Sequence, residues 1–228
     1  MTDEESTREY EARSRYQDPE TAREYDRARF RGDRKRERKD AATKRAVMEA
    51  LRRLGDVGTV LDVPCGTGRM TRLLMEEGFS YTGTDVSAEM MRVARSKLEE
   101  PGKVRLVQAD AAALPFPDGT FDCVVTVRFL NLIPSEARVR ILKEFHRVSN
   151  GHMVAVATHL GPDSSLRRRL RALVPGLAAE PEGEESPRLS MYRDIRRAGW
   201  EEHFEVPYKY ALLSRARAVC VFRKASAQ

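Results

Sequence analysis

Residues 59–74 constrain the fold more than any other part of the chain. Residues 59–63 are a short apolar run with β-branched side chains, which predicts a buried strand. A turn with Gly66 and Gly68 follows at once, and residues 70–74 have the spacing of a helix. Glycine lets the backbone approach a ligand, and the N–H groups of a helix start point towards it. The order strand, glycine turn, helix therefore predicts an α/β fold with a ligand site at the turn.

The spacing of the glycines narrows the class of ligand. The dinucleotide pattern G-x-G-x-x-G fails, because Thr71 stands where the third glycine belongs. Asp62 ends the predicted strand, four residues before Gly66. A carboxylate at that point suits a ligand with an ammonium group better than one with a pyrophosphate. An NAD-dependent dehydrogenase is therefore the weakest of the enzyme classes considered.

Acidic residues also follow the next two predicted strands. Residues 79–84 are expected to form a strand that ends in Asp85, where a carboxylate can accept hydrogen bonds from two ribose hydroxyls. The alternative role of Asp85 is to cap the helix that begins near Ser87. Residues 104–108 predict a third strand, followed by Asp110, which can accept from an adenine amino group. The N–H of Ala111 can then donate to the adenine ring.

The series continues with the block Leu-Pro-Phe-Pro-Asp-Gly-Thr-Phe-Asp at residues 114–122. Together, these motifs resemble the class I S-adenosylmethionine (SAM)-dependent methyltransferases, in particular the large group that includes the ubiquinone and menaquinone enzymes. The resemblance covers about residues 58–160. This sequence departs from the family pattern D-x-G-x-G-x-G at Pro64, which replaces the first glycine. Proline has a fixed negative φ and no N–H, so the turn can use neither a positive φ nor a donor there.

The resemblance implies a Rossmann-like α/β fold. Its seven-stranded mixed sheet would have an antiparallel last strand, helices on both faces and an N-terminal helical segment. It also implies SAM as cofactor and S-adenosylhomocysteine as product. The leading segment Tyr25-Asp26-Arg27-Ala28 is similar to one that lies over the cofactor in many such enzymes. The residues expected to bind the cofactor are Tyr25, Arg29, Asp62, Pro64, Cys65, Gly66, Gly68, Arg69, Asp85, Val86, Met90, Asp110, Ala111 and Val127.

The implied reaction demands little from the protein's side chains. The methyl group of SAM is activated by its sulfonium, so the enzyme mainly holds an acceptor in line, which supplies roughly 7–11 kcal/mol of the barrier. We therefore expect no catalytic triad, metal cluster or nucleophile. His159, after the fifth predicted strand, is the candidate general base for an acceptor that is protonated, with a surface histidine as the alternative. Arg128, after the fourth strand, is the candidate for contacting the acceptor or cofactor.

The chain divides into a helical segment at residues 1–54, a possible lid, and a methyltransferase domain at residues 55–228. Helices are expected at residues 18–30, 34–54, 135–148 and 190–199, and later strands at 121–127, 153–158, 200–206 and 216–222. An insertion at about residues 162–188 would contain a basic amphipathic helix at 166–173. An acidic, proline-containing linker at 180–187 would follow that helix.

Composition limits the partners. The 228 residues carry a net charge of +6, which favours anionic partners without specifying nucleic acid. No apolar run approaches the ~20 residues of a membrane span. The acidic N-terminus does not resemble a signal peptide, and three dispersed cysteines indicate neither disulfides nor zinc. A cytoplasmic location is therefore expected.

We expect a small-molecule acceptor, which would be anionic if the arginines at 167–171 lie at its entrance. Methylation of nucleic-acid bases is disfavoured. The DNA and RNA amino-methyltransferases carry Asn/Asp-Pro-Pro-aromatic where this chain has Val127-Arg128-Phe129-Leu130. The cytosine-C5 enzymes need a Pro-Cys nucleophile in the same region, whereas the only Pro-Cys pair of this sequence is inside the turn at 64–65. RNA-directed methylation, through the basic helix, and a non-catalytic SAM-binding regulator remain as alternatives. The acceptor, the methylated atom and the oligomeric state are left open.

Overall fold

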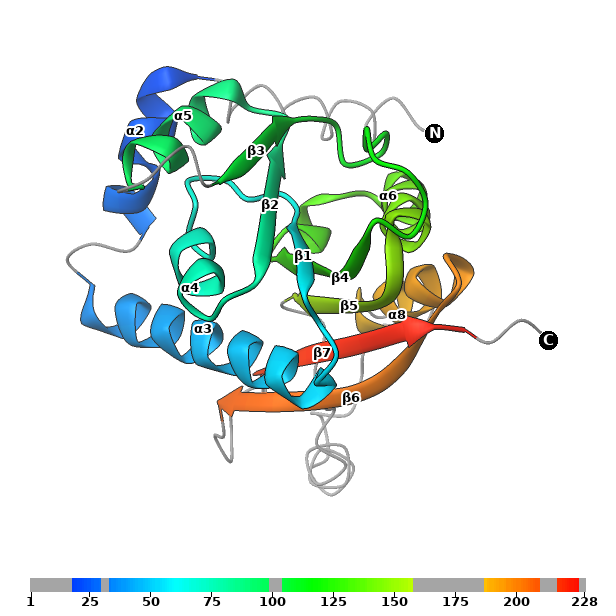
Figure 1. Ribbon diagram of the computed structural model, residues 1–228. Helices are drawn as coiled ribbons and strands as arrows, with labels where there is room; N and C mark the ends of the chain where they lie inside the picture. The colour runs from blue at the N-terminus through cyan, green and yellow to red at the C-terminus, as the bar shows by residue number, and fades with distance from the viewer. Residues whose placement is uncertain (1–17, 30–32, 99–103, 158–186, 210–216, 226–228) are drawn as a thin grey trace.

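The computed structural model describes residues 18–29, 33–98, 104–157, 187–209 and 217–225 (Figure 1). Its centre is a seven-stranded sheet with the order β3-β2-β1-β4-β5-β7-β6. The strands are β1 (Thr59–Asp62), β2 (Ser80–Asp85), β3 (Arg105–Gln108), β4 (Phe121–Val127), β5 (Ser149–Val156), β6 (Trp200–Lys209) and β7 (Arg217–Lys224). β1 to β5 are parallel, and β7 runs antiparallel to both of its neighbours, β5 and β6. The predicted sheet, with an antiparallel last strand, is confirmed.

Helices cover both faces of the sheet, as expected. They are α2 (Pro19–Arg29), α3 (Arg34–Leu54), α4 (Thr71–Glu76), α5 (Ala88–Ser96), α6 (Ser135–Val148) and α8 (Pro187–Arg197), with a short 3₁₀ helix η2 (Leu130–Leu132). One hydrophobic core lies between the sheet and α6 and α8, and a second between the sheet and α3 and α4. Figure 1 shows these two pairs of helices on opposite sides of the sheet.

The central strands serve both cores because neighbouring side chains point to opposite faces. In β4, Val124 belongs to the core under α6, whereas Cys123 and Val125 belong to the core under α3. In β7, Phe222 and Val221 divide in the same way. These side chains are fully buried. Continuous apolar runs are what a parallel sheet covered on both faces requires.

Most boundaries agree with the sequence patterns. α3 begins after Asp33, whose carboxylate accepts from the N–H groups of Lys35 and Arg36, and it ends at Gly55, where φ is 77°. β5 begins earlier than expected, because Ser149 pairs with Phe121 at the start of β4. α8 begins at Pro187, within the range expected for the linker, since proline is well suited to the first helical position. The basic helix at 166–173 and residues 180–186 lie outside the described residues.

No described helix is both long enough and apolar enough to cross a membrane.

Candidate active site

A cavity opens at the carboxyl ends of the central parallel strands. Its walls come from the segments that follow β1, β2, β3 and β4, together with α2, η2 and α6. This is where ligands bind in open α/β sheets. The lining residues are Tyr25, Asp62, Val63, Pro64, Cys65, Gly66, Thr67, Arg69, Met70, Asp85, Val86, Met90, Ala109, Asp110, Ala111, Val127, Arg128, Phe129, Leu132, Ile133 and Ile141.

The turn after β1 is tied to the end of β2. The N–H of Cys65 donates to the carbonyl of Thr84 at 2.7 Å, and the N–H of Gly66 donates to Oδ2 of Asp85 at 2.9 Å. Gly66 and Gly68 have φ values of 54° and 76°, the left-handed region that glycine tolerates. A Cβ on Gly68 would lie 3.0 Å from that of Ala94 in α5. Glycine there lets the turn pack closely on α5, while Gly66 faces the cavity.

Asp62 is a carboxylate with little compensation for its burial. It is 2% exposed, and the hydroxyl of Tyr81 donates to its Oδ2 at 3.2 Å. The hydroxyls of Tyr81 and Thr71 lie 2.8 Å apart. Burial raises the pKa of Asp62 from 3.8 to about 7, although the Tyr81 hydrogen bond and the charge of Arg69 oppose this. A cationic ligand in the cavity would therefore stabilise the ionised form.

Asp85 is held by backbone donors from two directions. Its carboxylate accepts from the N–H of Gly66 and from the N–H of Ser87, each at 2.9 Å. Burial raises its pKa, and these backbone hydrogen bonds oppose the shift. The α5 cap is Ser87 instead, whose Oγ accepts from the N–H of Met90 at 3.1 Å. A carboxylate offers about four acceptor positions, so Asp85 retains capacity for two ligand hydroxyls.

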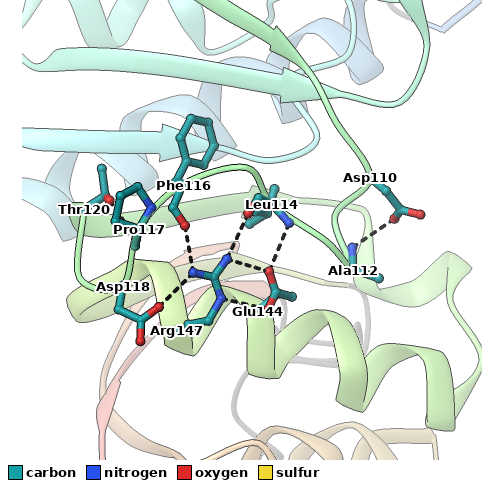
Figure 2. A network of polar contacts seen from close by, with 9 residues as sticks. All are labelled: Asp110, Ala112, Leu114, Phe116, Pro117, Asp118, Thr120, Glu144 and Arg147. Atoms are coloured by element: carbon teal, nitrogen blue, oxygen red, sulfur yellow. Dashed lines mark hydrogen bonds and ion pairs between the residues drawn. The ribbon is translucent and has the colours of Figure 1, made fainter.

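Asp110 shapes the wall next to β3. Its Oδ1 accepts from the N–H of Ala112 at 2.9 Å (Figure 2), and its carbonyl accepts from the N–H of Ala113 at 3.0 Å. The N–H of Ala109 donates to the carbonyl of Asp85 at 3.1 Å. These bonds join the segments after β2 and β3 into one continuous wall.

Two arginines, Arg69 and Arg128, also line the cavity. Arg69 forms an ion pair with Asp40 of α3. Arg128 directly follows β4 with a φ of 61°, and its N–H donates to the carbonyl of Val156 at 2.7 Å. Left-handed backbone costs a non-glycine residue about 1–3 kcal/mol and is concentrated at functional sites. Burial lowers the pKa of Arg128, and the nearby charge of Arg69 adds to this effect.

The structure brings nearly all predicted cofactor residues into one cavity. Of those whose side chains are described, Gly68 stays out of the lining, for the packing reason given above. The side chain of Arg29 and the whole of His159 lie outside the described residues. Sequence reasoning did not predict Val63, Thr67, Met70, Ala109, Phe129, Leu132, Ile133 and Ile141. Residues 129–133 could have been predicted to line the cavity, because they follow β4 at the same edge of the sheet as the loops after β1, β2 and β3.

The middle of the chain is similar in sequence to known proteins. Residues 60–151 match the family described as "Methyltransferase domain". Over 93 residues the chain is 41% identical to the demethylmenaquinone methyltransferase of Thermus thermophilus, covering 39% of this chain and 41% of that protein. Over 110 residues it is 39% identical to the phosphatidylethanolamine N-methyltransferase of Cereibacter sphaeroides, covering 46% and 53%. The matches thus span about half or less of these relatives.

Solved structures extend the similarity of fold to nearly the whole chain. Magnesium protoporphyrin IX methyltransferase from Synechocystis PCC 6803, with bound S-adenosylhomocysteine, has a TM-score of 0.66 at 14% identity and covers 95% of this chain and 100% of that one. The PH0226 protein of Pyrococcus horikoshii has a TM-score of 0.63 at 20% identity, with 88% and 98% covered. At such identities the similarity concerns the fold alone.

Proposed function

We propose that the chain transfers a methyl group from SAM to a small-molecule acceptor, which agrees with the match of residues 60–151 to the methyltransferase domain family and with the resemblance carried by the motifs. One observation carries the proposal. Asp62, Asp85 and Asp110, from three neighbouring strand ends, line a single cavity with the glycine turn. Such a row of carboxylates suits a ligand with an ammonium, a ribose and an amino-substituted ring.

The strand order predicts how the cofactor would lie along the carboxyl edge of the sheet. Along the carboxyl edge of the sheet, Asp110, Asp85, Asp62 and Arg128 lie at the ends of β3, β2, β1 and β4 in that order. Asp110 and the N–H of Ala111 would hold the adenine, and Asp85 would accept from the ribose hydroxyls. Asp62 would face the ammonium of the methionine part. SAM itself supplies a methyl group already activated by its sulfonium, so the protein's task is alignment.

The acceptor would enter beside β4. The wall there is apolar, with Phe129, Ile133 and Ile141, and Arg128 adds a cation. We propose an acceptor with an apolar body, for which an anionic group would be compatible with Arg128. The relatives' names, which include a quinone and a phospholipid enzyme, agree with an apolar body but differ in the acceptor.

The N-terminal helices contribute to the site, so residues 1–54 are proposed as a cover for the cofactor. Tyr25 of α2 lines the cavity, and Asp40 of α3 pairs with Arg69. Deleting residues 1–32 should abolish methyl transfer while the sheet stays folded by circular dichroism. Full activity in a folded truncation would contradict a covering role. The three cysteines are free and buried, and we place the activity in the reducing cytoplasm.

Calorimetry tests the cofactor directly. The protein should bind SAM and S-adenosylhomocysteine, and NAD should give no heat. Asp56→Asn, an exposed aspartate just before β1, is the control that should bind like the unmodified chain. Incubation of cell extracts with SAM and protein, followed by mass spectrometry, should then reveal products heavier by one methylene. Binding of NAD without binding of either SAM compound would overturn the proposal.

A further inference from the structure

A polar network outside the cavity centres on Arg147, in the last turn of α6 (Figure 2). Its guanidinium donates to the carbonyls of Leu114 and Phe116 at 2.9 and 2.7 Å. It also donates to Oε1 and Oε2 of Glu144 and to Oδ1 of Asp118, each at 2.9 Å. These five hydrogen bonds use every N–H that an arginine has. No lysine could reproduce this planar arrangement of donors.

Glu144 also accepts a hydrogen bond from the loop between β3 and β4. Its Oε2 accepts from the N–H of Leu114 at 3.0 Å as well as from Arg147. The hydrogen bond from Arg147 lowers the pKa of Glu144. Leu114 is therefore held at both its N–H and its carbonyl by two side chains of one helix.

Backbone hydrogen bonds also tie the loop between β3 and β4, among them those from the N–H of Phe116 to the carbonyl of Leu114 and from the N–H of Gly119 to the carbonyl of Arg147, each at 2.9 Å. The loop crosses from one edge of the sheet to the middle without a helix or strand of its own, apart from a bridge between Asp110 and Ala113. The side chains of Leu114 and Phe116 are buried, and the ring of Phe116 meets that of Phe121 edge to face at 5.0 Å. The core thus anchors the side chains, while Arg147 and Glu144 fix the orientation of the peptide groups.

The held peptide lies directly beside the cavity wall. Leu114 follows a turn in which the N–H of Ala113 donates to the carbonyl of Asp110 and the N–H of Ala112 donates to its carboxylate. Asp110 and Ala111 line the cavity. A rotation of the Leu114 peptide would therefore be passed through one turn to the donor and acceptor expected to face the adenine.

We propose that Arg147 and Glu144 are positioning residues that set the cavity's selectivity for adenine over a ring without its amino group. The inference rests on the proposed function, because it needs the ring to lie against Asp110 and Ala111. Neither residue lines the cavity, so both act through the loop. An Asp110 carboxylate aimed correctly accepts from an amino group, whereas a carbonyl oxygen attached to the ring at that position would face it unfavourably.

The test compares two ligands that differ at one ring position. S-adenosylhomocysteine and S-inosylhomocysteine share their ribose and amino-acid parts, so their affinity ratio reports on the adenine end alone. The unmodified protein should prefer the adenosyl compound. Arg147→Gln should reduce that preference by about five- to tenfold, the scale of one net hydrogen bond, and Arg147→Lys should restore part of it. Affinity for the inosyl compound should change little.

Two variants separate positioning from general stability. Arg197→Gln removes an exposed arginine of α8 that pairs with Glu136 of α6, and it should leave the ligand ratio unchanged. Trp200→Phe removes the indole N–H that donates to the carbonyl of Leu142, so it should lower the melting temperature while keeping the ligand ratio. If Arg147→Gln does not fold, Glu144→Gln replaces it, with the same expected loss of preference.

An unchanged ratio in a folded Arg147 or Glu144 variant would overturn the inference, as would an equal loss in Trp200→Phe. If the unmodified protein binds neither homocysteine compound, the proposed function fails instead.

Discussion

Asp62 and Asp122 lie at opposite ends of the paired strands β1 and β4, and they are treated in opposite ways. At the amino ends, Asp122 accepts from the N–H groups of Gly58 and Thr59 and from the Thr59 hydroxyl, at 3.0, 2.8 and 2.8 Å. At the carboxyl ends, Oδ2 of Asp62 accepts a hydrogen bond from the hydroxyl of Tyr81 at 3.2 Å. Asp122 is partly exposed, whereas Asp62 is buried.

The electrostatic consequences differ accordingly. Burial acts to raise the pKa of Asp122, but the hydrogen bonds from Thr59 and Gly58 outweigh it and leave the pKa lowered. For Asp62 burial prevails, and the pKa rises to about 7. One end of the strand pair therefore holds the two strands together, and the other keeps a poorly compensated carboxylate, to which the proposed function assigns a cationic ligand.

The largest effect is expected from a substitution of Asp62. Asp62→Asn should weaken SAM binding about thirtyfold or more, because removing one partner of a buried charge pair costs roughly 2–5 kcal/mol or more. The same change should stabilise the unliganded protein at pH 8, since it removes a buried negative charge. Calorimetry and urea unfolding measure the two effects. Unaltered SAM affinity would show that the ammonium lies elsewhere.

The pH dependence of stability should separate the two carboxylates. The folded pKa of Asp62 is raised, so the unfolded chain loses this proton from pH 3.8 upward while the folded chain keeps it to about pH 7. The unfolding free energy without ligand should therefore fall between these values because of Asp62. The lowered pKa of Asp122 gives the opposite slope, with stability lost as the pH falls below about 4. A series of urea titrations checks both slopes, and Asp62→Asn should remove the first while leaving the second.

Asp85 lies between these extremes, since it is buried but well supplied with backbone donors. Asp85→Ala should reduce SAM affinity by about 1–3 kcal/mol, the scale of hydrogen bonds lost to a buried charged group. Because the N–H groups of Gly66 and Ser87 lose their acceptor, some stability should be lost as well. Isothermal titration with SAM, beside Asp56→Asn as control, measures the affinity. If the variant bound SAM as tightly as the unmodified protein, the role of Asp85 would be limited to supporting the turn after β1.

At the amino ends, Asp122→Asn should lower the unfolding free energy by about 1–2 kcal/mol, allowing for the partial exposure of this group. Asparagine keeps one acceptor oxygen for Gly58 and Thr59 but loses the charge. SAM affinity should stay within twofold of the unmodified protein, because Asp122 is remote from the cavity lining. A large loss of affinity in a folded variant would contradict the division between the two ends.

The smallest expected effect is at Tyr81. Tyr81→Phe removes the hydroxyl that donates to Asp62, so the pKa of Asp62 should rise further. SAM affinity at pH 7 should fall by about 1 kcal/mol, and its rise with pH should shift to higher pH. Calorimetry between pH 6 and 9 shows the shift. A uniform loss at every pH would indicate a packing defect instead.

Much of the fold was predictable because local patterns and tertiary burial agree. β4 and α6 have the expected bounds of 121–127 and 135–148. The start of β5 was not predictable, since Ser149, Asn150, Gly151 and His152 show no apolar alternation. They extend the strand because β4 offers a partner from Phe121 onward. Pairing between distant strands decides such boundaries, and one chain's local pattern does not contain it.

The site, too, was predictable from the sequence only in part. The acidic residues could be predicted, because carboxyl ends of parallel strands share one edge of the sheet. The contact of Tyr81 with Asp62 could not, because it depends on the register that pairs Tyr81 with Val60, two residues before Asp62 on the same face. Arg147 and Glu144 show only an ordinary i, i+3 charge pair in the sequence. Their bonds to Leu114 and Phe116 arise from how α6 packs under a loop distant in sequence.

The position of β7 has a consequence for how the protein is made. β7 follows β6 in the chain but lies between β5 and β6, and β6 pairs with no other described strand. During synthesis, which proceeds at about 5–20 residues per second from the N-terminus, β6 leaves the ribosome before β7, with which it pairs, has been made. Completion of the sheet must wait for Arg217–Lys224, so the nascent chain carries an open edge at β5 until that strand inserts.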